Sequence, residues 1–417
     1  MVDLLEKLRP LSERIGADRM ETDAAIAAAY AVDGLRPEAV IFPRNTREVA
    51  EVVKVAGREH LSVIPWGSGT KMGMGNVPSR VDLVVCSSKM NHMLDVDTAN
   101  LTITVEAGVK FRDIQARLAT EDDRCYLPLE DLTTSQDELI CSDRANSGCF
   151  LAMDPPFCET ATIGGIVAVN SSGPRRLLYR FPRDQLLGAR FVSPDGEIIG
   201  TGGKTVKNVS GYDISKLMVG SAGSLGYITE MTFRLLPLPE HVETLVLTFT
   251  SFDGACDVAE MVLDTTLLPA AVEIINPRAC EALPLGDAAG GEAGIYGVAV
   301  AMEAFAPAVT RMKKEILDMG RHKGAVGDFA FEEDDHRRFW LGVSHLQEFG
   351  KLNDPQPLSF QLTYPLSGTR DVVSHAEAAL AESPMPHALM VHVGTGGSVV
   401  TLSHEVSEGE GEKRVIA

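Results

Sequence analysis

The sequence has no apolar run that could cross a membrane and no excess of positive charge. None of its hydrophobic stretches approaches the roughly 20 residues that a membrane-spanning helix requires. The 38 Lys and Arg are outnumbered by 58 Asp and Glu, which gives a formal net charge of −20. Nucleic-acid binding needs a basic surface, so we expect no nucleic-acid partner. An anionic substrate would need a local basic patch against this negative field.

The first residues and the cysteine spacing exclude further classes. Residues 1–6 are acidic and lack the basic region of a signal peptide, which predicts a cytoplasmic location. None of the seven cysteines forms a C-x2-C pair. The four between residues 125 and 158 are spaced by 16, 8 and 9 residues, which matches no usual zinc or iron–sulfur pattern. We therefore predict reduced thiols and no metal site.

Two common nucleotide motifs are also missing. The loop Gly67-Ser68-Gly69-Thr70-Lys71 follows a predicted strand but lacks the Walker spacing, which argues against a nucleoside triphosphate. It contains no G-x-G-x-x-G that opens a helix, so a Rossmann NAD site is not supported. Two glycines, two hydroxyl residues and a lysine after a strand can still surround a phosphate.

Glycine and small hydroxyl residues recur in short blocks between residues 160 and 226. The blocks are Thr162–Arg176, Arg183–Gly188, Lys207–Asp213 and Gly220–Gly226. Glycine lets the backbone approach another surface closely, so such blocks can place N–H groups around a phosphate or a flat ring. Tight turns in a β-rich domain would give the same composition.

The order of these blocks, with Pro65–Thr70 upstream, resembles the vanillyl-alcohol oxidase type of FAD-binding domain. Within that family the sequence is most similar to the FAD-binding subunits of glycolate oxidases. The similarity extends from about Ala39 to Pro239 and is weak afterwards. It is carried by Gly173-Pro174-Arg175-Arg176, by Arg183-Asp184 with Leu187-Gly188, by Lys207 to Asp213 and by Lys216 to Ser221.

The resemblance implies a two-domain α+β fold, an FAD-binding domain with an α+β capping domain. We predict a helical arm over residues 1–35, the FAD-binding domain over 36–239, the capping domain over 240–402 and a flexible acidic tail over 403–417. Strand and helix signals alternate after residue 240, which indicates one sheet covered by helices. A hairpin is predicted around Pro194-Asp195-Gly196, and a last strand over Ala388–Val393. The irregular stretch 125–157 is long enough to be a lid or an interface.

The resemblance also implies which residues contact FAD. The pyrophosphate would rest on residues 67–71, the ring and ribityl chain would pass residues 162–172, and the adenine would meet residues 220–228. Asp184 would accept a hydrogen bond from the ring or ribityl chain, or would form a structural salt bridge with Arg183 or Arg180. The predicted cofactor-binding residues are Pro65, Gly67, Ser68, Gly69, Thr70, Lys71, Thr162, Gly164, Gly165, Ser172, Asp184, Gly220, Gly223, Gly226 and Ile228.

Oxidation of a hydroxy acid needs a base near the α-carbon and a cation for the carboxylate. Catalytic relatives carry a His-x-Gly-Asp-Gly-x-x-His stretch in the capping domain. The nearest match, His392 to Ser398, lacks the acid and the second histidine, so His392 is either the base or a structural residue. A basic cluster, from which we take Arg176 as the carboxylate ligand, is either an anion site or a solvated loop. Its members are Arg175, Arg176, Arg180 and Arg183.

A second basic group follows an acidic run later in the chain. It consists of His336, Arg337 and Arg338, and this pattern predicts an exposed helix face.

The function that the resemblance implies is an FAD-binding subunit of a glycolate or D-lactate oxidising complex. A sister flavoprotein subunit would oxidise the 2-hydroxy acid, and an iron–sulfur subunit would carry the electrons away. The incomplete histidine stretch favours an electron relay in this chain. Two alternatives remain: a self-sufficient FAD-dependent 2-hydroxyacid dehydrogenase, and a non-catalytic scaffold that keeps the fold without flavin. Through its partners the cytoplasmic chain could lie at the inner face of a membrane.

Overall fold

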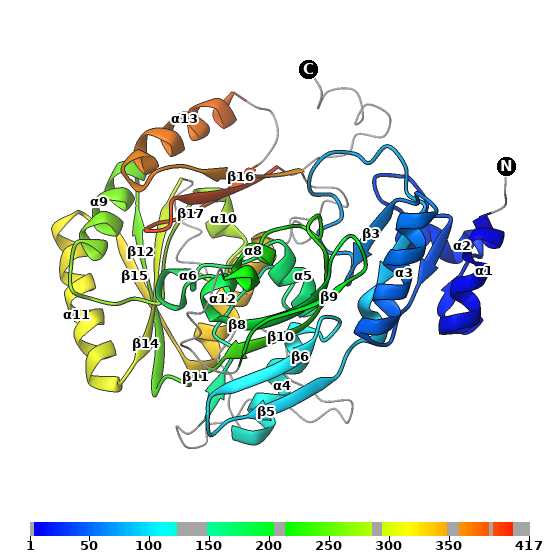
Figure 1. Ribbon diagram of the computed structural model, residues 1–417. Coiled ribbons are helices and arrows are strands. Elements are labelled where there is room, and N and C mark those ends of the chain that lie inside the picture. The colour runs from blue at the N-terminus through cyan, green and yellow to red at the C-terminus, as the bar shows by residue number, and fades with distance from the viewer. Residues whose placement is uncertain are drawn as a thin grey trace.

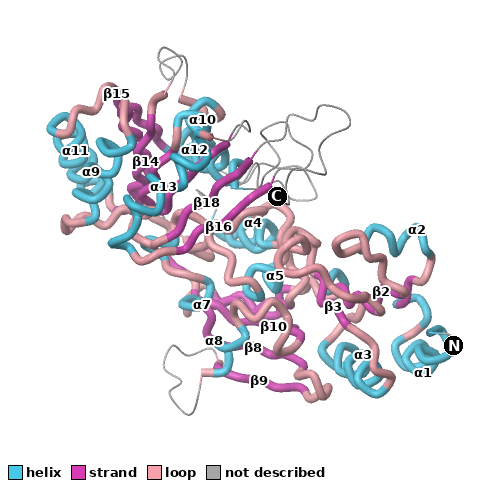
Figure 2. Tube along the Cα trace, turned by 90° about the horizontal axis from the view of Figure 1, so that it is seen from above, coloured by secondary structure: helices cyan, strands magenta, loops and turns pink. Residues whose placement is uncertain are grey.

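The computed structural model describes residues 4–122, 148–203, 213–285, 294–347, 358–382 and 387–402. Three sheets follow one another along the chain, with four, five and seven strands, besides one two-stranded ribbon. The four-stranded and seven-stranded sheets lie at opposite ends of the molecule, and the five-stranded sheet lies between them (Figures 1 and 2). No helix in these ranges combines the length and apolar character of a membrane span. The block 207–212 and the tail 403–417 lie outside the described residues.

The four-stranded sheet has the order β1-β2-β4-β3. Strands β2, β4 and β3 are parallel, and β1 is antiparallel to β2. The apolar face of α3 covers the sheet with Val49, Val52 and Val55. The elements are α1 (Leu4–Ile15), β1 (Met20–Glu21), α2 (Ala24–Ala27), β2 (Ala39–Ile41), α3 (Thr46–Arg58), β3 (Val63–Trp66) and β4 (Leu83–Cys86).

The N-terminal segment is a part of this sheet layer rather than a separate helical arm. Met20 pairs with Ile41, so β1 forms the edge of the sheet. Leu8 and Leu11 of α1 are fully buried in the core that α3 and the sheet share. A two-residue strand gives no periodic signal in the sequence, which explains why the prediction for residues 1–35 missed it.

The five-stranded sheet is antiparallel, with the order β5-β6-β10-β8-β9. The predicted hairpin is confirmed, because β8 and β9 pair across the turn in which Gly196 has a φ of +82°. The strands are β5 (Met93–Asp97), β6 (Thr102–Glu106), β8 (Leu186–Val192), β9 (Ile198–Gly202) and β10 (Tyr227–Arg234), and β7 (Cys149–Phe150) pairs with β11 (Leu236–Pro237). The helices are α4 (Phe111–Asp122), α5 (Ile163–Ala168), α6 (Arg176–Tyr179), α7 (Pro182–Gln185) and α8 (Ile214–Met218).

The seven-stranded sheet forms the capping domain, with the order β15-β12-β14-β13-β17-β18-β16. One face packs against α9, α11 and α13, and the other packs against α10 and α12. The strands are β12 (His241–Phe249), β13 (Ala271–Ile275), β14 (Tyr296–Ala304), β15 (Gly327–Glu332), β16 (Leu358–Thr363), β17 (His387–His392) and β18 (Gly397–Leu402). The helices are α9 (Phe252–Leu263), α10 (Pro277–Glu281), α11 (Ala306–His322), α12 (Glu333–Gln347) and α13 (Thr369–Ala381).

Two predictions for this domain need correction. The strand at Ala388–Val393 is not the last one, because the glycine-rich turn after His392 leads into β18. His336 is not on an exposed face, because its side chain is completely buried on the side of α12 that carries Phe339 and Trp340. Residues three and four positions apart lie on one helix face, so the apolar pair decides where His336 points.

The short helix α6 joins the two domains. It belongs to the FAD-binding segment of the chain, yet Leu177 packs against one core of the capping domain and Leu178 and Tyr179 pack against the other. The helix α6 therefore lies against the cap, which places Arg176 and the preceding Arg175 at the interface.

Candidate functional site

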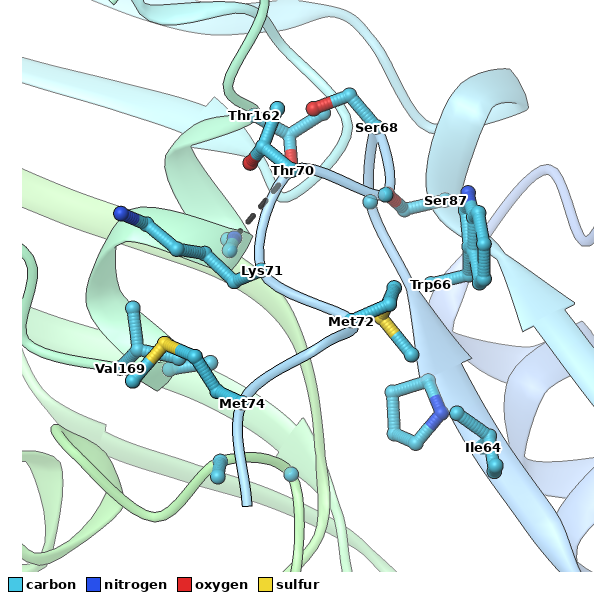
Figure 3. A pocket seen from close by; sticks show the side chains of 18 of the residues that line it. Ile64, Trp66, Ser68, Thr70, Lys71, Met72, Met74, Ser87, Thr162 and Val169 are labelled. Atoms are coloured by element: carbon cyan, nitrogen blue, oxygen red, sulfur yellow. Dashed lines mark hydrogen bonds between the residues drawn. The ribbon is translucent and has the colours of Figure 1, made fainter. Parts of the chain in front are cut away.

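A groove of about 470 Å³ lies between the four-stranded and five-stranded sheets. This volume is within the range of small-molecule pockets. Most of its lining comes from three segments: the loop after β3, the residues of and around α5, and the turn before β10. Figure 3 shows this loop, with the Lys71 side chain extending away from Trp66.

The groove brings together most of the predicted cofactor-binding residues. Ser172 and Asp184 do not line it. Those that do are Pro65, Gly67, Ser68, Gly69, Thr70, Lys71, Thr162, Gly164, Gly165, Gly220, Gly223, Gly226 and Ile228.

Glycine is required where the segments meet. A Cβ on Gly67 would lie 2.2 Å from Oγ1 of Thr162. That hydroxyl oxygen accepts a hydrogen bond from the N–H of Gly165 at 3.3 Å and caps α5. Likewise, a Cβ on Gly223 would lie 2.8 Å from Cγ of Pro65. The glycine blocks thus let loops of two different sheets touch, as close backbone approach requires.

The polar groups of the groove suit a phosphate. Within the described chain, the N–H groups of Ser68, Gly69 and Thr70 donate to no other backbone oxygen, so they are available to an anion. The ammonium of Lys71 lies 4.7 Å from the centre of the Phe157 ring. Phosphate-sized anions are therefore matched by both backbone donors and a cation.

The remaining lining suits flat rings. Ile64, Trp66 and Met72 give the groove an apolar wall, and the indole of Trp66 is packed against Tyr30 with a ring separation of 5.3 Å. Beside the groove, Oδ1 of Asn170 and Oγ of Ser221 are buried without a hydrogen-bond partner in the described chain. Unpartnered polar atoms of this kind are rare, and a ligand can satisfy them. These residues fit a dinucleotide with an aromatic ring system, such as FAD.

Asp184 has a local structural role. It lies exposed, and its carboxylate accepts a hydrogen bond from the N–H of Phe181 at 3.1 Å, which closes the first turn of α7. Ser172 lies beyond the groove, where its hydroxyl accepts a hydrogen bond from Nη1 of Arg176 at 3.4 Å. The structure therefore brings Ser172 to the interface between the domains.

The predicted basic cluster divides into two pairs. Arg180 and Arg183 are exposed, whereas Arg175 and Arg176 are buried. Neither a solvated loop nor a single anion patch describes all four. The two buried arginines are neighbours in sequence, but they enter different clusters of the capping domain.

Arg175 is paired with carboxylates of both domains. Its Nε donates to Glu303 at 2.6 Å, and its Nη1 lies 3.7 Å from Asp154. Burial alone would raise the pKa of Glu303, but the charge of Arg175 outweighs it and lowers the pKa to about 2. The phenol of Tyr179 also donates to Glu303, at 2.7 Å. This network ties the first turn of α6 to β14 and α12.

The tautomer of His336 follows from its neighbours. Arg175 can only donate, so Nε2 of His336 accepts from Nη2 at 3.0 Å. Nδ1 then donates to the hydroxyl of Thr244 at 2.8 Å, which also accepts from the indole N–H of Trp340 at 2.7 Å. Burial and the adjacent guanidinium lower the pKa of His336, so the ring is neutral.

Arg176 is buried without a carboxylate partner. Its Nε donates to the hydroxyl of Thr395 at 3.3 Å, and Nη1 reaches Ser172. No carboxylate of the described residues pairs with it, and Nη2 makes no hydrogen bond there. Burial lowers the pKa of the guanidinium, because a buried cation is costly unless it is paired. Only 7% of the residue is exposed, so the guanidinium is held in a nearly buried position without an ion-pair partner in the described chain.

His392 and Glu273 lie next to Arg176. Nδ1 of His392 is 2.8 Å from both carboxylate oxygens of Glu273, and the two residues are 3% and 1% exposed. A Cβ on Gly397 would lie 3.0 Å from Nη2 of Arg176 and 3.8 Å from Cδ2 of His392. The missing side chain at Gly397 therefore lets the guanidinium and the imidazole face each other.

Burial governs the ionisation of this pair. It lowers the pKa of His392 well below its usual value, and the positive charge of Arg176 acts in the same direction. It raises the pKa of Glu273, which Arg176 opposes. Glu273 and Thr395 were not predicted from the sequence, although a single acid within the apolar strand Ala271–Ile275 is an unusual feature that could have drawn attention.

Two family models match most of the chain. The FAD binding domain matches residues 37–130 and 142–202, and the C-terminal domain of FAD linked oxidases matches residues 238–417. The chain belongs to the FAD-linked oxidases. Its cofactor is FAD, in agreement with the groove described above, and the family consists of FAD-dependent oxidoreductases.

Named relatives of this FAD-linked oxidase act on hydroxy acids. It is 32% identical to the glycolate oxidase subunit GlcD of Bacillus subtilis over 66% of this chain and 53% of that protein. It is 31% identical to a D-lactate dehydrogenase of Archaeoglobus fulgidus over 70% of this chain and 58% of that protein. The chain thus spans little more than half the length of these curated relatives.

The fold is that of the vanillyl-alcohol oxidase type. A solved p-cresol methylhydroxylase superposes with a TM-score of 0.72 at 16% identity, covering 96% of this chain and 83% of that one. At this identity the likeness concerns the fold alone. Among the described residues of the FAD-linked oxidase, no three His, Cys, Asp or Glu side chains gather as a metal site would require.

Proposed function

We propose that this FAD-linked oxidase is the FAD-binding subunit of a complex that oxidises a short 2-hydroxy acid such as glycolate or D-lactate. The names of its relatives support this substrate class. We further propose that this chain binds the hydroxy acid itself, between α6 and the β17–β18 turn.

The single observation that carries the proposal is the unpaired guanidinium of Arg176. Arg175, its neighbour, has a carboxylate at 2.6 Å, whereas the polar partners of Arg176 in the described chain are two hydroxyls, at 3.3 and 3.4 Å. The ring of Phe181, 5.7 Å from the guanidinium carbon, adds no negative charge. Guanidinium binds carboxylate through two parallel hydrogen bonds, and Nη2 is available for one of them. A substrate carboxylate would supply the missing charge.

His392 would serve as the base. With Nδ1 held by Glu273, Nε2 faces no hydrogen-bonding partner in the described chain and can take the proton of the substrate hydroxyl. Bound FAD would accept the two electrons that leave the α-carbon as a hydride. The groove would hold the cofactor through residues 67–71, 162–165 and 220–228.

Residues 169–176 connect the groove to the cluster. Val169 lines the groove, and Ser172, three residues later, contacts Arg176 at the interface. Electrons would then leave through the flavin to an iron–sulfur partner, with a sister flavoprotein subunit in the same complex. The word subunit in the name of one relative supports an assembly of this kind. A cytoplasmic location stays a prediction.

An anaerobic spectrum of the purified holoprotein tests the proposal. Addition of glycolate or D-lactate should bleach the flavin band of the isolated chain, and Arg176→Met should prevent bleaching while it retains the flavin. Bleaching only after a sister flavoprotein is added would contradict a substrate site in this chain and would favour the relay function. Absence of bound flavin would favour a scaffold.

Self-sufficient catalysis is the second candidate, favoured by the same Arg176–His392 cluster. Steady turnover of the isolated chain with a dye acceptor would support it. If the reduced flavin is reoxidised only by an iron–sulfur partner, the subunit function holds.

A further inference from the structure

Three buried ionisable side chains meet between the domains: Arg176 from α6, Glu273 from β13 and His392 from β17. Glu273 and His392 share one hydrogen bond, so they gain or lose a proton as a pair. Arg176 has a fixed positive charge close to this pair. In a buried setting, the protonation of the pair must respond to any charge placed on Arg176.

The direction of this response follows from the charges. Without a ligand, the guanidinium disfavours a further proton on His392 and favours ionised Glu273. A carboxylate at Arg176 offsets that positive field with one negative charge. With the field of the guanidinium offset, a proton on the pair is no longer repelled, so the proton affinity of the pair rises.

We infer that a carboxylate bound at Arg176 causes the Glu273–His392 pair to take up a proton. This inference rests on the proposed function, because the carboxylate is that of the 2-hydroxy acid. Glu273 is a positioning residue in this scheme: it holds Nδ1 of His392, directs Nε2 toward the substrate, and stabilises the imidazolium once it forms.

The coupling makes the base respond to the correct substrate. His392 gains affinity for a proton only when a carboxylate occupies Arg176, so an alcohol without a carboxylate would meet a weak base. With a 2-hydroxy acid, the proton that the pair takes up would be the hydroxyl proton of the substrate, which would pass to Nε2 as the hydride leaves the α-carbon for the flavin. A 2-oxo acid has no such proton, so the pair would take one from solvent. The proton returns to solvent when the 2-oxo acid dissociates and the field of Arg176 is restored.

Proton uptake by the pair must be distinguished from proton uptake by other titratable groups near Arg176. Burial raises the pKa of Asp154 to about 7, opposed mainly by Arg175 and to a smaller extent by Arg176, so Asp154 would also respond to an anion bound at Arg176. Burial raises the pKa of Tyr364, so its phenol stays protonated at neutral pH. Cys256 has a pKa raised to about 12 by burial and stays a thiol. Asp154 is therefore the one competing group that a control must remove.

Isothermal titration of the oxidised holoprotein with pyruvate, a 2-oxo acid that the oxidised enzyme cannot oxidise further, tests the inference. The heat is measured in two buffers of different ionisation enthalpy, between about pH 6 and pH 9, which gives the protons exchanged per ligand bound. The parent protein should take up as much as about one proton per pyruvate at the best pH. Asp154→Asn should retain this uptake.

Two conservative variants should lose the proton uptake on pyruvate binding. His392→Asn keeps a donor toward Glu273 but cannot titrate, and Glu273→Gln keeps an acceptor for Nδ1 but carries no charge. Their flavin content and thermal midpoints show whether they are folded, and either one alone is sufficient for the test. The pH dependence of kcat/KM should also be shifted in Glu273→Gln relative to the parent.

Three other outcomes would refute the inference, and each has a different consequence for the site. Pyruvate binding without proton exchange in the parent would overturn the coupling but leave Arg176 as the carboxylate ligand. Uptake that persists in His392→Asn and disappears in Asp154→Asn would assign the proton to Asp154. If pyruvate does not bind, or binds equally to Arg176→Met, the proposed function fails together with the inference.

Discussion

Replacing each of the two neighbouring arginines by methionine should have opposite consequences. Arg175→Met leaves the buried carboxylate of Glu303 without its cation and removes the 2.6 Å hydrogen bond between the two side chains. Arg176→Met removes a buried cation that has no carboxylate partner in the described chain. We expect the first variant to be unstable and the second to be stable but poor at binding substrate.

The magnitudes follow from the partners. Breaking a buried ion pair from one side costs about 3–5 kcal/mol, so Arg175→Met should lose that much free energy of unfolding. In Arg176→Met, two long hydrogen bonds are lost but an unpaired charge is no longer buried, so the net change should be within about 1 kcal/mol. A charged hydrogen bond to substrate is worth about 1.5–3 kcal/mol, which corresponds to a loss of carboxylate affinity on the order of 10- to 100-fold.

Denaturant titration of both holoproteins measures the stabilities, and titration with pyruvate measures the affinities. Comparison within the pair controls for the general effect of placing methionine at the start of α6. If Arg176→Met is as unstable as Arg175→Met, Arg176 is a structural residue and the reasoning about an unpaired cation is refuted.

Three further predictions concern the groove and the interface. Gly67→Ala should lower the flavin content at least about tenfold, because its Cβ would displace the hydroxyl that caps α5. The control Gly200→Ala, with nothing within 4 Å of its Cβ, should retain flavin. Equal flavin content in both variants would contradict the close-approach argument. The pKa of Glu303 is depressed to about 2, so its contribution to stability is complete above about pH 4.5 and is lost as the pH falls through 2. The difference in free energy of unfolding between the parent and Glu303→Gln should therefore shrink over that interval. A constant difference would contradict the ion pair. Flavin binding should quench the fluorescence of Trp66, which lines the groove, so a Trp66→Phe variant should show much less quenching than the parent; unchanged quenching would assign the signal to Trp340.

The strands of the capping domain were largely predictable, because apolar runs of β-branched residues between helical patterns are a local signal. The alternation of strand and helix signals predicted after residue 240 corresponds to elements such as β13 (Ala271–Ile275), which α9 precedes and α10 follows. The edge strand β1 was missed because two residues carry no period, and β18 was missed because glycine at its start weakens the strand pattern. These errors occur where pairing with a distant strand, not local sequence, decides the conformation.

The site was predictable in part, for a similar reason. Glycine spacing indicated the segments that meet in the groove, since close approach allows no other residue at positions such as Gly67. The burial of His336 depended on Phe339 and Trp340 facing the sheet. The different environments of Arg175 and Arg176 could not be read from two identical adjacent residues.

The sequence by itself determined the cofactor class and the two-domain order, because glycine blocks and strand patterns are local and keep their order along the chain. Only the tertiary structure decided which buried charges are paired. Arg175 meets Glu303 across 128 residues, and His392 meets Glu273 across 119. The energy of a buried charge depends on the few groups within hydrogen-bonding distance, and folding alone brings those groups together.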